Sequence, residues 1–107
     1  ENKDSQTLYV KPSFNGGDAN QFARWVNTQL KWPDKILEYG IDGRVIVKFT
    51  IDKDGSVTNV KVINGIHPDI DEEAVRVVSS SPRWTPGSLE GEPVPVTYTF
   101  PIIVIHR

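Results

Sequence analysis

Residues 93–105 read Pro-Val-Pro-Val-Thr-Tyr-Thr-Phe-Pro-Ile-Ile-Val-Ile, and this stretch has the alternating pattern of a β-strand. Successive side chains of a strand point to opposite sides, so residues two apart share a face. The even-numbered positions are all apolar, and we expect them to pack against a core. They are Val94, Val96, Tyr98, Phe100, Ile102 and Val104.

Two prolines of this stretch, Pro95 and Pro101, lie at odd-numbered positions. Because the direction of the backbone N–H also alternates, both missing donors belong to the same lateral edge of the strand. A strand that lacks donors along one edge cannot be central in a sheet. We therefore expect an edge strand whose free side is open between the prolines, at Thr97 and Thr99.

An open strand edge is a template on which another chain can add a strand. The pattern therefore predicts a small module that binds an extended peptide. The alternative reading is that the prolines only protect the edge against aggregation.

Composition limits the class of protein. A chain of 107 residues with 37% hydrophobic and 24% charged residues fits one soluble globular domain. The formal net charge of −2 and the scattered Lys and Arg residues argue against nucleic acid as the main partner. The absence of Cys excludes disulfides and thiolate metal sites. The absence of Met predicts that the chain is a fragment or a processed form.

Three helices are expected. The first begins at Asp18, which forms a capping box with Gln21, and ends near Leu30. A short helix opens at Pro33 and ends at Gly40. The third is expected to be capped by Asp69, with Glu72 completing a second capping box.

Two further strands precede the third helix. Residues 43–51 and 56–64 alternate in hydrophobicity and are joined by the turn Asp52-Lys53-Asp54-Gly55. We therefore predict an α+β fold with a three-stranded antiparallel sheet and two main helices packed on one face. Residues 1–13 are expected to be a linker end or an extended segment, in which residues 7–10 could form a strand, and residues 14–107 form the domain.

No residues suggest catalysis or metal binding. The turn ending in Gly55 fails as a calcium loop, because Lys61 would occupy the position that needs a bidentate Glu. The only two histidines, His67 and His106, have no ligand cluster and are expected at the surface. We predict that the domain is not an enzyme and that it needs no cofactor and no metal.

A series of short segments resembles the C-terminal domain of TonB energy transducers, in the same order and spacing. The match runs from about residue 14 to the end of the chain. The segments are Phe14-Asn15-Gly16-Gly17, Trp32-Pro33, Gly40-Ile41-Asp42-Gly43-Arg44-Val45, Val47-Lys48-Phe49-Thr50-Ile51-Asp52, Asp54-Gly55-Ser56-Val57, Asp71-Glu72-Glu73-Ala74-Val75-Arg76-Val77-Val78, Ser81-Pro82-Arg83-Trp84-Thr85-Pro86-Gly87, Gly91-Glu92-Pro93-Val94 and Tyr98-Thr99-Phe100-Pro101-Ile102.

This resemblance implies a periplasmic domain of a protein anchored in the inner membrane of Gram-negative bacteria. Such a domain grips the TonB box, a short extended peptide of TonB-dependent outer-membrane transporters, beside the last strand of its sheet. The proton-motive force that drives nutrient uptake would reach it from ExbB/ExbD-type motor proteins through an N-terminal anchor. The family commonly has Tyr-Pro where this chain has Trp32-Pro33, so its partner specificity could differ.

The resemblance and the strand pattern together name the candidate binding residues. On the last strand they are Val94, Val96, Thr97, Tyr98, Thr99 and Phe100. Gln29, Lys31 and Trp32 lie where family members approach their partner, although an exposed helix end is the alternative reading for Gln29.

Two other functions stay open on the sequence. The last strands of two copies could pair to form a homodimer. Alternatively, similar domains sit at the end of membrane metallopeptidases of the BlaR type, where the role is sensory. Light scattering across protein concentration would separate the homodimer, and the sequence upstream of residue 1 would separate the sensory reading.

Overall fold

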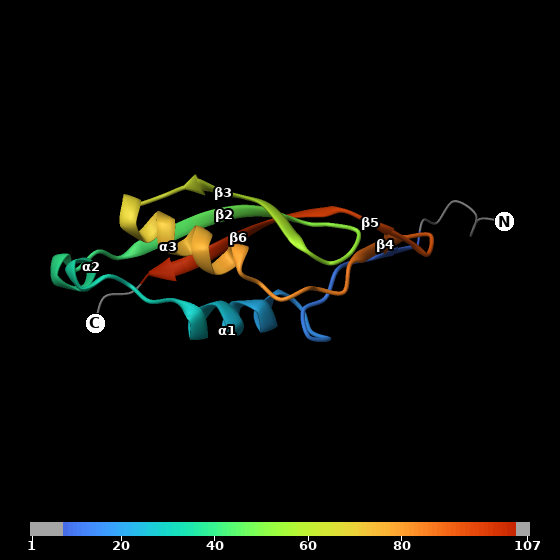
Figure 1. The fold of residues 1–107 in the computed structure, drawn as a ribbon, viewed down its shortest axis with the longest axis horizontal. Helices are drawn as coiled ribbons and strands as arrows, with labels where there is room; N and C mark the ends of the chain where they lie inside the picture. The colour runs from blue at the N-terminus through green and yellow to red at the C-terminus, as the bar shows by residue number, and fades with distance from the viewer. Residues whose placement is uncertain (1–7, 105–107) are drawn as a thin grey trace.

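The computed structural model of the chain describes residues 8–104, without the side chains of Lys35, Leu37 and Tyr39. It confirms an α+β fold (Figure 1). The elements in chain order are β1 (Tyr9–Val10), α1 (Ala19–Gln29), α2 (Asp34–Tyr39), β2 (Gly43–Ile51), β3 (Val57–Asn64), α3 (Pro68–Ser79), β4 (Gly87–Leu89), β5 (Glu92–Val94) and β6 (Val96–Val104).

The main sheet has three antiparallel strands in the order β3-β2-β6. β6 therefore lies at an edge, as the position of the prolines predicts. The expected alternation is also confirmed, because Phe100, Ile102 and Val104 are buried while Thr97 and Thr99 are exposed.

A second small sheet, with the strand order β1-β4-β5, corrects the prediction of a single sheet. The stretch expected to be one continuous strand is divided at Pro95, since β5 ends at Val94 and β6 begins at Val96. β5 pairs with β4, whereas β6 pairs with β2. Ile105, the last residue of the predicted strand, lies outside the described residues.

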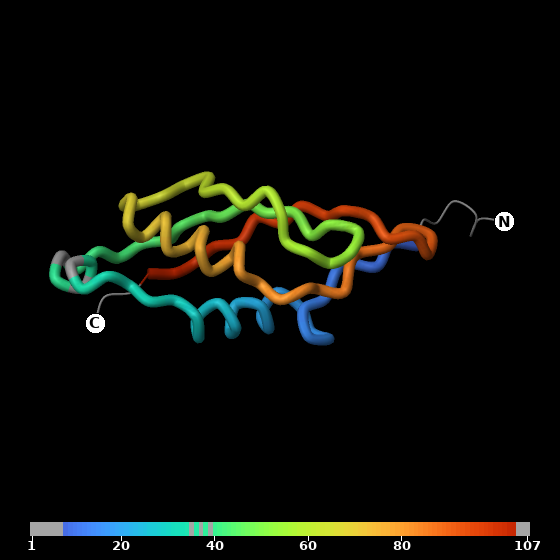
Figure 2. Tube along the Cα trace, viewed as in Figure 1, coloured from blue at the N-terminus to red at the C-terminus, as the bar shows by residue number. Residues whose placement is uncertain are grey.

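The small sheet makes the molecule elongated and ties the start of the chain to its later part. Figure 2 shows the trace running from the small sheet into α1 and returning after α3 to the same end. A tight turn joins β4 to β5, with positive φ angles of 52° at Glu90 and 83° at Gly91. Two successive positive φ angles are the geometry of a type I′ hairpin turn. Tyr9 and Val10 form β1, so part of the segment 7–10 is a strand.

α1 begins after Asp18 and has Leu30 as its C-cap, as expected. The predicted capping box is wrong in its second half. The Asp18 carboxylate accepts a hydrogen bond from the N–H of Asn20 at 3.0 Å, but the Gln21 side chain accepts one from Arg24 at 3.2 Å. Gln21 thus bonds to a cation within its own helix instead of turning back to the cap.

α3 begins before the predicted position, because His67 is its N-cap and Asp69 is not. His67 Nδ1 accepts the N–H of Asp69 at 3.1 Å, and the imidazole is half-buried rather than at the open surface. Pro68 occupies the first turn, where its fixed φ suits the helix and its missing N–H is not needed. This proline moves the start of the helix toward the N-terminus.

α1, α3 and the inner face of the main sheet share one hydrophobic core. The ring of Phe22 lies at its centre, 5.6 Å from the ring centre of Phe49 and 5.1 Å from that of Phe100. Trp25 is half-buried and stacks on Phe22. The fully or almost fully buried residues include Phe14, Phe22, Val26, Val45, Val47, Phe49, Ile51, Ile70, Ala74, Val77, Val78 and Trp84. Val60, Val62 and Tyr98 are partly buried against them.

Trp84 fastens the connector after α3 to the β2–β3 turn. Its backbone N–H donates to the carbonyl of Gly55 at 2.8 Å, and its side chain is 4% exposed. Gly55 has a φ of 88°, and a Cβ atom added there would lie 2.0 Å from the Trp84 carbonyl oxygen. The turn therefore needs glycine both for its backbone conformation and for the close approach of the connector.

Candidate functional site

The outer edge of β6 is the first candidate site. β2 pairs with β6 on one side, and no strand among residues 8–104 pairs with its other side. The register runs without a shift from Gly43 opposite Val104 to Ile51 opposite Val96. In such an antiparallel ladder, hydrogen-bonded and non-bonded positions alternate.

Pro101 indicates which positions of β6 face away from β2. It lies opposite Ile46 and has no N–H, so a regular ladder requires it at a non-bonded position. Thr97 and Thr99 have the same parity as Pro101 and lie opposite Thr50 and Lys48. Their N–H and C=O groups therefore point toward the free edge.

Not all the predicted strand residues belong to this edge. Val96, Thr97, Tyr98, Thr99 and Phe100 lie in β6. Val94 belongs to β5, where it pairs with Gly87 of the small sheet. Pro95 lies in the break between the two strands, so the free edge of β6 starts immediately after it.

The other predicted residues, Gln29, Lys31 and Trp32, lie at the end of α1 and in the segment after it. They are not brought together with Thr97: in Figure 1 the end of α1 lies near the end of β6, and β5 lies at the opposite end of the molecule. The side chain of Gln29 donates to Thr28 Oγ1 at 3.2 Å, and Trp32 is partly buried against the core.

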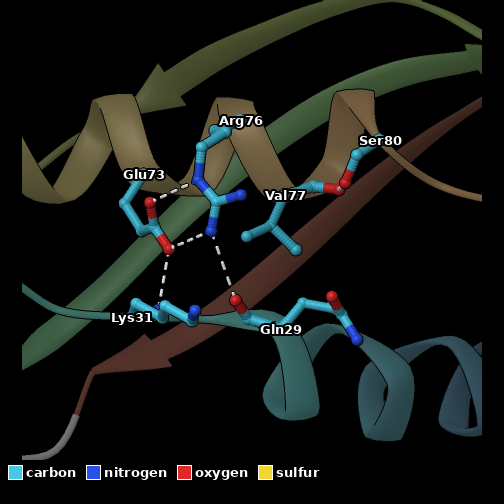
Figure 3. Close-up of polar contacts among 6 residues, drawn as sticks. All are labelled: Gln29, Lys31, Glu73, Arg76, Val77 and Ser80. Atoms are coloured by element: carbon cyan, nitrogen blue, oxygen red, sulfur yellow. Dashed lines mark hydrogen bonds and ion pairs between the residues drawn. The ribbon is translucent and has the colours of Figure 1, made fainter.

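An ion pair on α3 holds this segment in place (Figure 3). Glu73 accepts the backbone N–H of Lys31 at 2.7 Å and two hydrogen bonds from Arg76, at 2.8 and 2.7 Å. Arg76 also donates to the carbonyl oxygen of Gln29 at 3.3 Å. Gln29 and Lys31 are therefore anchored through their backbones. Our sequence analysis missed Glu73 and Arg76, although their spacing of three residues on a helix is the signal of such a pair.

Comparison with known proteins gives the family. The family model described as the Gram-negative bacterial TonB protein C-terminal matches residues 28–103. This chain belongs to the TonB C-terminal family. Over 79 residues it is 33% identical to Protein TonB of two Helicobacter pylori strains, J99 and 26695. The match covers 69% of this chain and 28% of the length of those relatives.

The structure agrees with this membership. An NMR solution structure of the H. pylori TonB C-terminal domain superposes with a TM-score of 0.62 at 25% identity, covering 80% of this chain and 90% of that one. A second NMR structure of that domain superposes with a TM-score of 0.58 at 26% identity, covering 88% of this chain and 89% of that one. TonB proteins act in transport and energy transduction, and their C-terminal domain lies in the periplasm.

Two hollows border the inner side of the β6 edge in this TonB C-terminal domain. One, of about 90 Å³, lies between α1 and the later half of β6, with Ala23 and Asn27 on one side and Phe100 and Ile102 on the other. The second, of about 220 Å³, lies beside Tyr98. Burial raises the pKa of the Tyr98 hydroxyl, and the nearby Tyr9 adds to this effect.

The hydrogen-bond partners of Glu73 lower the pKa of its carboxyl group. The hydrogen bonds from Arg76 lower the pKa of Glu73, against the opposing effect of burial, and the bond from the Lys31 N–H lowers it further. The side chain of Glu73 is 11% exposed, whereas that of Arg76 is 54% exposed. The carboxylate is thus the covered partner, and it is held in its charged form.

The lowered pKa of Glu73 predicts a pH-dependent contribution to stability. A carboxylate whose pKa is lower in the folded state stabilises the fold above its ordinary pKa, and the contribution is lost as pH falls through the folded value. We expect Glu73→Gln to have a lower melting temperature than wild type at pH 7. This difference in melting temperature should shrink as the pH falls toward 3. Thermal unfolding across this range measures the effect.

Glu72→Gln is the matched control for this experiment, because Glu72 is the exposed neighbouring carboxylate on the same helix. It removes the same charge without breaking the bonds to Lys31 and Arg76. A Glu73→Gln variant whose difference from wild type is independent of pH would contradict the assigned role of the ion pair.

Within residues 8–104 no group of three or more His, Asp or Glu side chains could hold a metal ion. Nor does any described helix have the length and apolar character needed to cross a membrane.

Proposed function

We propose that this chain is the gripping module of a TonB-type energy transducer and that it holds the TonB box of an outer-membrane transporter by strand addition. The box would lie along the free edge of β6. The observation that carries this proposal is the open backbone edge at Thr97 and Thr99, bounded by Pro95 and Pro101.

The surroundings of the free edge suit a peptide whose side chains alternate between apolar and other types along the strand. In an added strand, side chains two residues apart point to the same face. Those facing α1 would meet the hollows of about 90 and 220 Å³, and their partly apolar lining favours small apolar side chains. Main-chain hydrogen bonds would supply the affinity for the peptide, and these hollows would supply the selectivity for its side chains.

Strand addition also suits the transfer of force. Several hydrogen bonds loaded together resist a pull, yet each contributes only about 1 kcal/mol net. The contact would therefore hold under load and still release. In this proposal the pull comes from ExbB/ExbD-type motor proteins in the inner membrane, drawing on the proton-motive force and acting through a preceding anchor.

An NMR titration tests the proposal. We expect a synthetic TonB box peptide from a transporter of the same genome to shift the backbone amide signals of Thr97, Thr99 and Ile103 most strongly. Shifts confined to the far strand β3 would contradict edge addition. Light scattering across protein concentration tests the homodimer alternative, in which the free β6 edges of two copies pair with each other.

A further inference from the structure

The outer face of the main sheet, turned away from the core, is positively charged. β2, β3 and β6 carry three basic residues, Arg44, Lys48 and Lys61, and no Asp or Glu. All three are exposed. The whole chain has a net charge of −2, so its carboxylates are concentrated on other elements. This asymmetry favours an acidic partner for this face.

Two of these cations are direct cross-strand partners. Lys48 of β2 lies opposite Lys61 of β3. Like charges directly opposite each other destabilise a sheet. Neither lysine forms an ion pair with another residue of the described range 8–104. A bound anion between the two ammonium groups would replace their repulsion by two attractions.

A hollow of about 280 Å³ lies at these lysines, and its other lining residues are Thr50, Asn59 and Thr97. The ladder between β2 and β3 shifts register between Lys48 and Thr50, and Asn59 has a positive φ of 53°. A β-bulge of this kind re-aims a side chain, which accounts for the place of Asn59 in the lining.

The lining is rich in hydrogen-bond donors. The hydroxyl oxygens of Thr50 and Thr97 lie 3.1 Å apart, so one donates to the other. The proton of the accepting hydroxyl stays available to a ligand, as do the amide of Asn59 and the two ammonium groups. Donors of this number and charge fit a carboxylate.

We propose that this outer face binds an acidic segment of a partner protein, with its carboxylates seated between Lys48 and Lys61. The contact is separate from strand addition at the β6 edge and does not depend on it. A protein segment fits better than a bilayer, because three cations are fewer than the clusters of four to eight that mark anionic-lipid binding. The carboxylates of the other elements would also oppose contact with an extended anionic surface.

The test compares two synthetic peptides, Glu-Thr-Glu-Thr-Glu-Thr and Gln-Thr-Gln-Thr-Gln-Thr, by NMR titration of the whole chain. The Glu peptide is expected to shift the amide signals of Thr50, Asn59 and Lys61 and to bind several-fold more tightly than the Gln peptide. Lys48→Gln and Lys61→Gln should each weaken its binding roughly three- to five-fold, and added salt should weaken it further. Lys53→Gln is the matched control, because Lys53 lies in the β2–β3 turn, outside the lining of the hollow.

A charge reversal keeps the test decisive if the single Lys→Gln substitutions change the affinity only slightly. The Lys48→Glu/Lys61→Glu double variant should prefer Lys-Thr-Lys-Thr-Lys-Thr over the Glu peptide. Thr99→Pro, which removes a donor from the β6 edge, should leave binding of the Glu peptide unchanged. The anion site and the TonB box site can therefore fail independently.

Three results would overturn the proposal. The first is equal affinity of wild type for the Glu and Gln peptides. The second is lysine-dependent binding of phosphatidylglycerol vesicles without binding of the Glu peptide, which would assign the face to lipid. The third is dimerisation lost in both lysine variants without binding of the Glu peptide, which would assign it to a second copy of the chain.

Discussion

Thr97→Pro is expected to weaken binding of a TonB box peptide by about fivefold or more while the domain stays folded. Proline removes the backbone donor at the centre of the free edge and leaves a peptide carbonyl without its partner. An unpaired group of this kind costs about 1–3 kcal/mol, which is enough for the expected loss. Thr97 has the parity of Pro101, so its N–H is not needed for the ladder to β2.

Thr97→Ala is the control for this substitution. It keeps the backbone donor and loses the hydroxyl that pairs with Thr50 on the outer face. We expect its affinity for the box peptide to stay within about threefold of wild type. Isothermal titration calorimetry measures both variants, and circular dichroism checks their fold.

Two outcomes would contradict the edge proposal in different ways. A folded Thr97→Pro domain that binds as tightly as wild type would show that the peptide does not pair at this position. An unfolded Thr97→Pro domain would show that the N–H of Thr97 bonds to β2, so that the parity of the ladder is the reverse of that argued from Pro101.

Phe49→Ala is expected to lower the free energy of unfolding by about 3–5 kcal/mol. Phe49 is 1% exposed, and its ring lies within 6.1 Å, centre to centre, of those of Phe22, Trp84 and Tyr98. Truncation leaves a cavity between α1, the connector after α3 and the sheet. The loss is a large share of the roughly 5–15 kcal/mol that stabilises a domain.

Chemical denaturation of wild type and variant measures this loss. Ile103→Ala is the matched control, because Ile103 is an apolar residue of the neighbouring strand that is 53% exposed. We expect it to cost less than about 1 kcal/mol. A Phe49→Ala loss as small as that of the control would mean that the inward face of β2 has been assigned wrongly.

The candidate site could be predicted only where its residues belong to one local pattern. Thr97 and Thr99 were predicted because two prolines of equal parity flank them in the local sequence, although the strand that carries them begins only after Pro95. Glu73 and Arg76 were missed because their partners, Lys31 and the carbonyl of Gln29, lie more than forty positions away in the sequence. The Lys48–Lys61 pair likewise depends on the β2–β3 register, which a bulge shifts.

Local periodicity and turn chemistry were sufficient for the main sheet and for both long helices. Alternation predicted the buried face of β2 and β6, and helical spacing predicted the burial of Phe22 and Val26. The glycine at position 55 predicted the hairpin turn. The series of short segments from residue 14 onward also predicted the TonB C-terminal family, which the family model confirms.

The division of the last strand at Pro95 and the second sheet depend on tertiary pairing. β1, β4 and β5 have two or three residues each, too few to show a period, and they are strands only because they hydrogen-bond to one another. The start of α3 also depends on tertiary packing. Both Asp69 and His67 can cap a helix, and the choice of His67 follows from Pro68 and the packed position of Ile70. Short elements and the relative positions of distant residues therefore required the folded chain, because their stabilising contacts are not local in sequence.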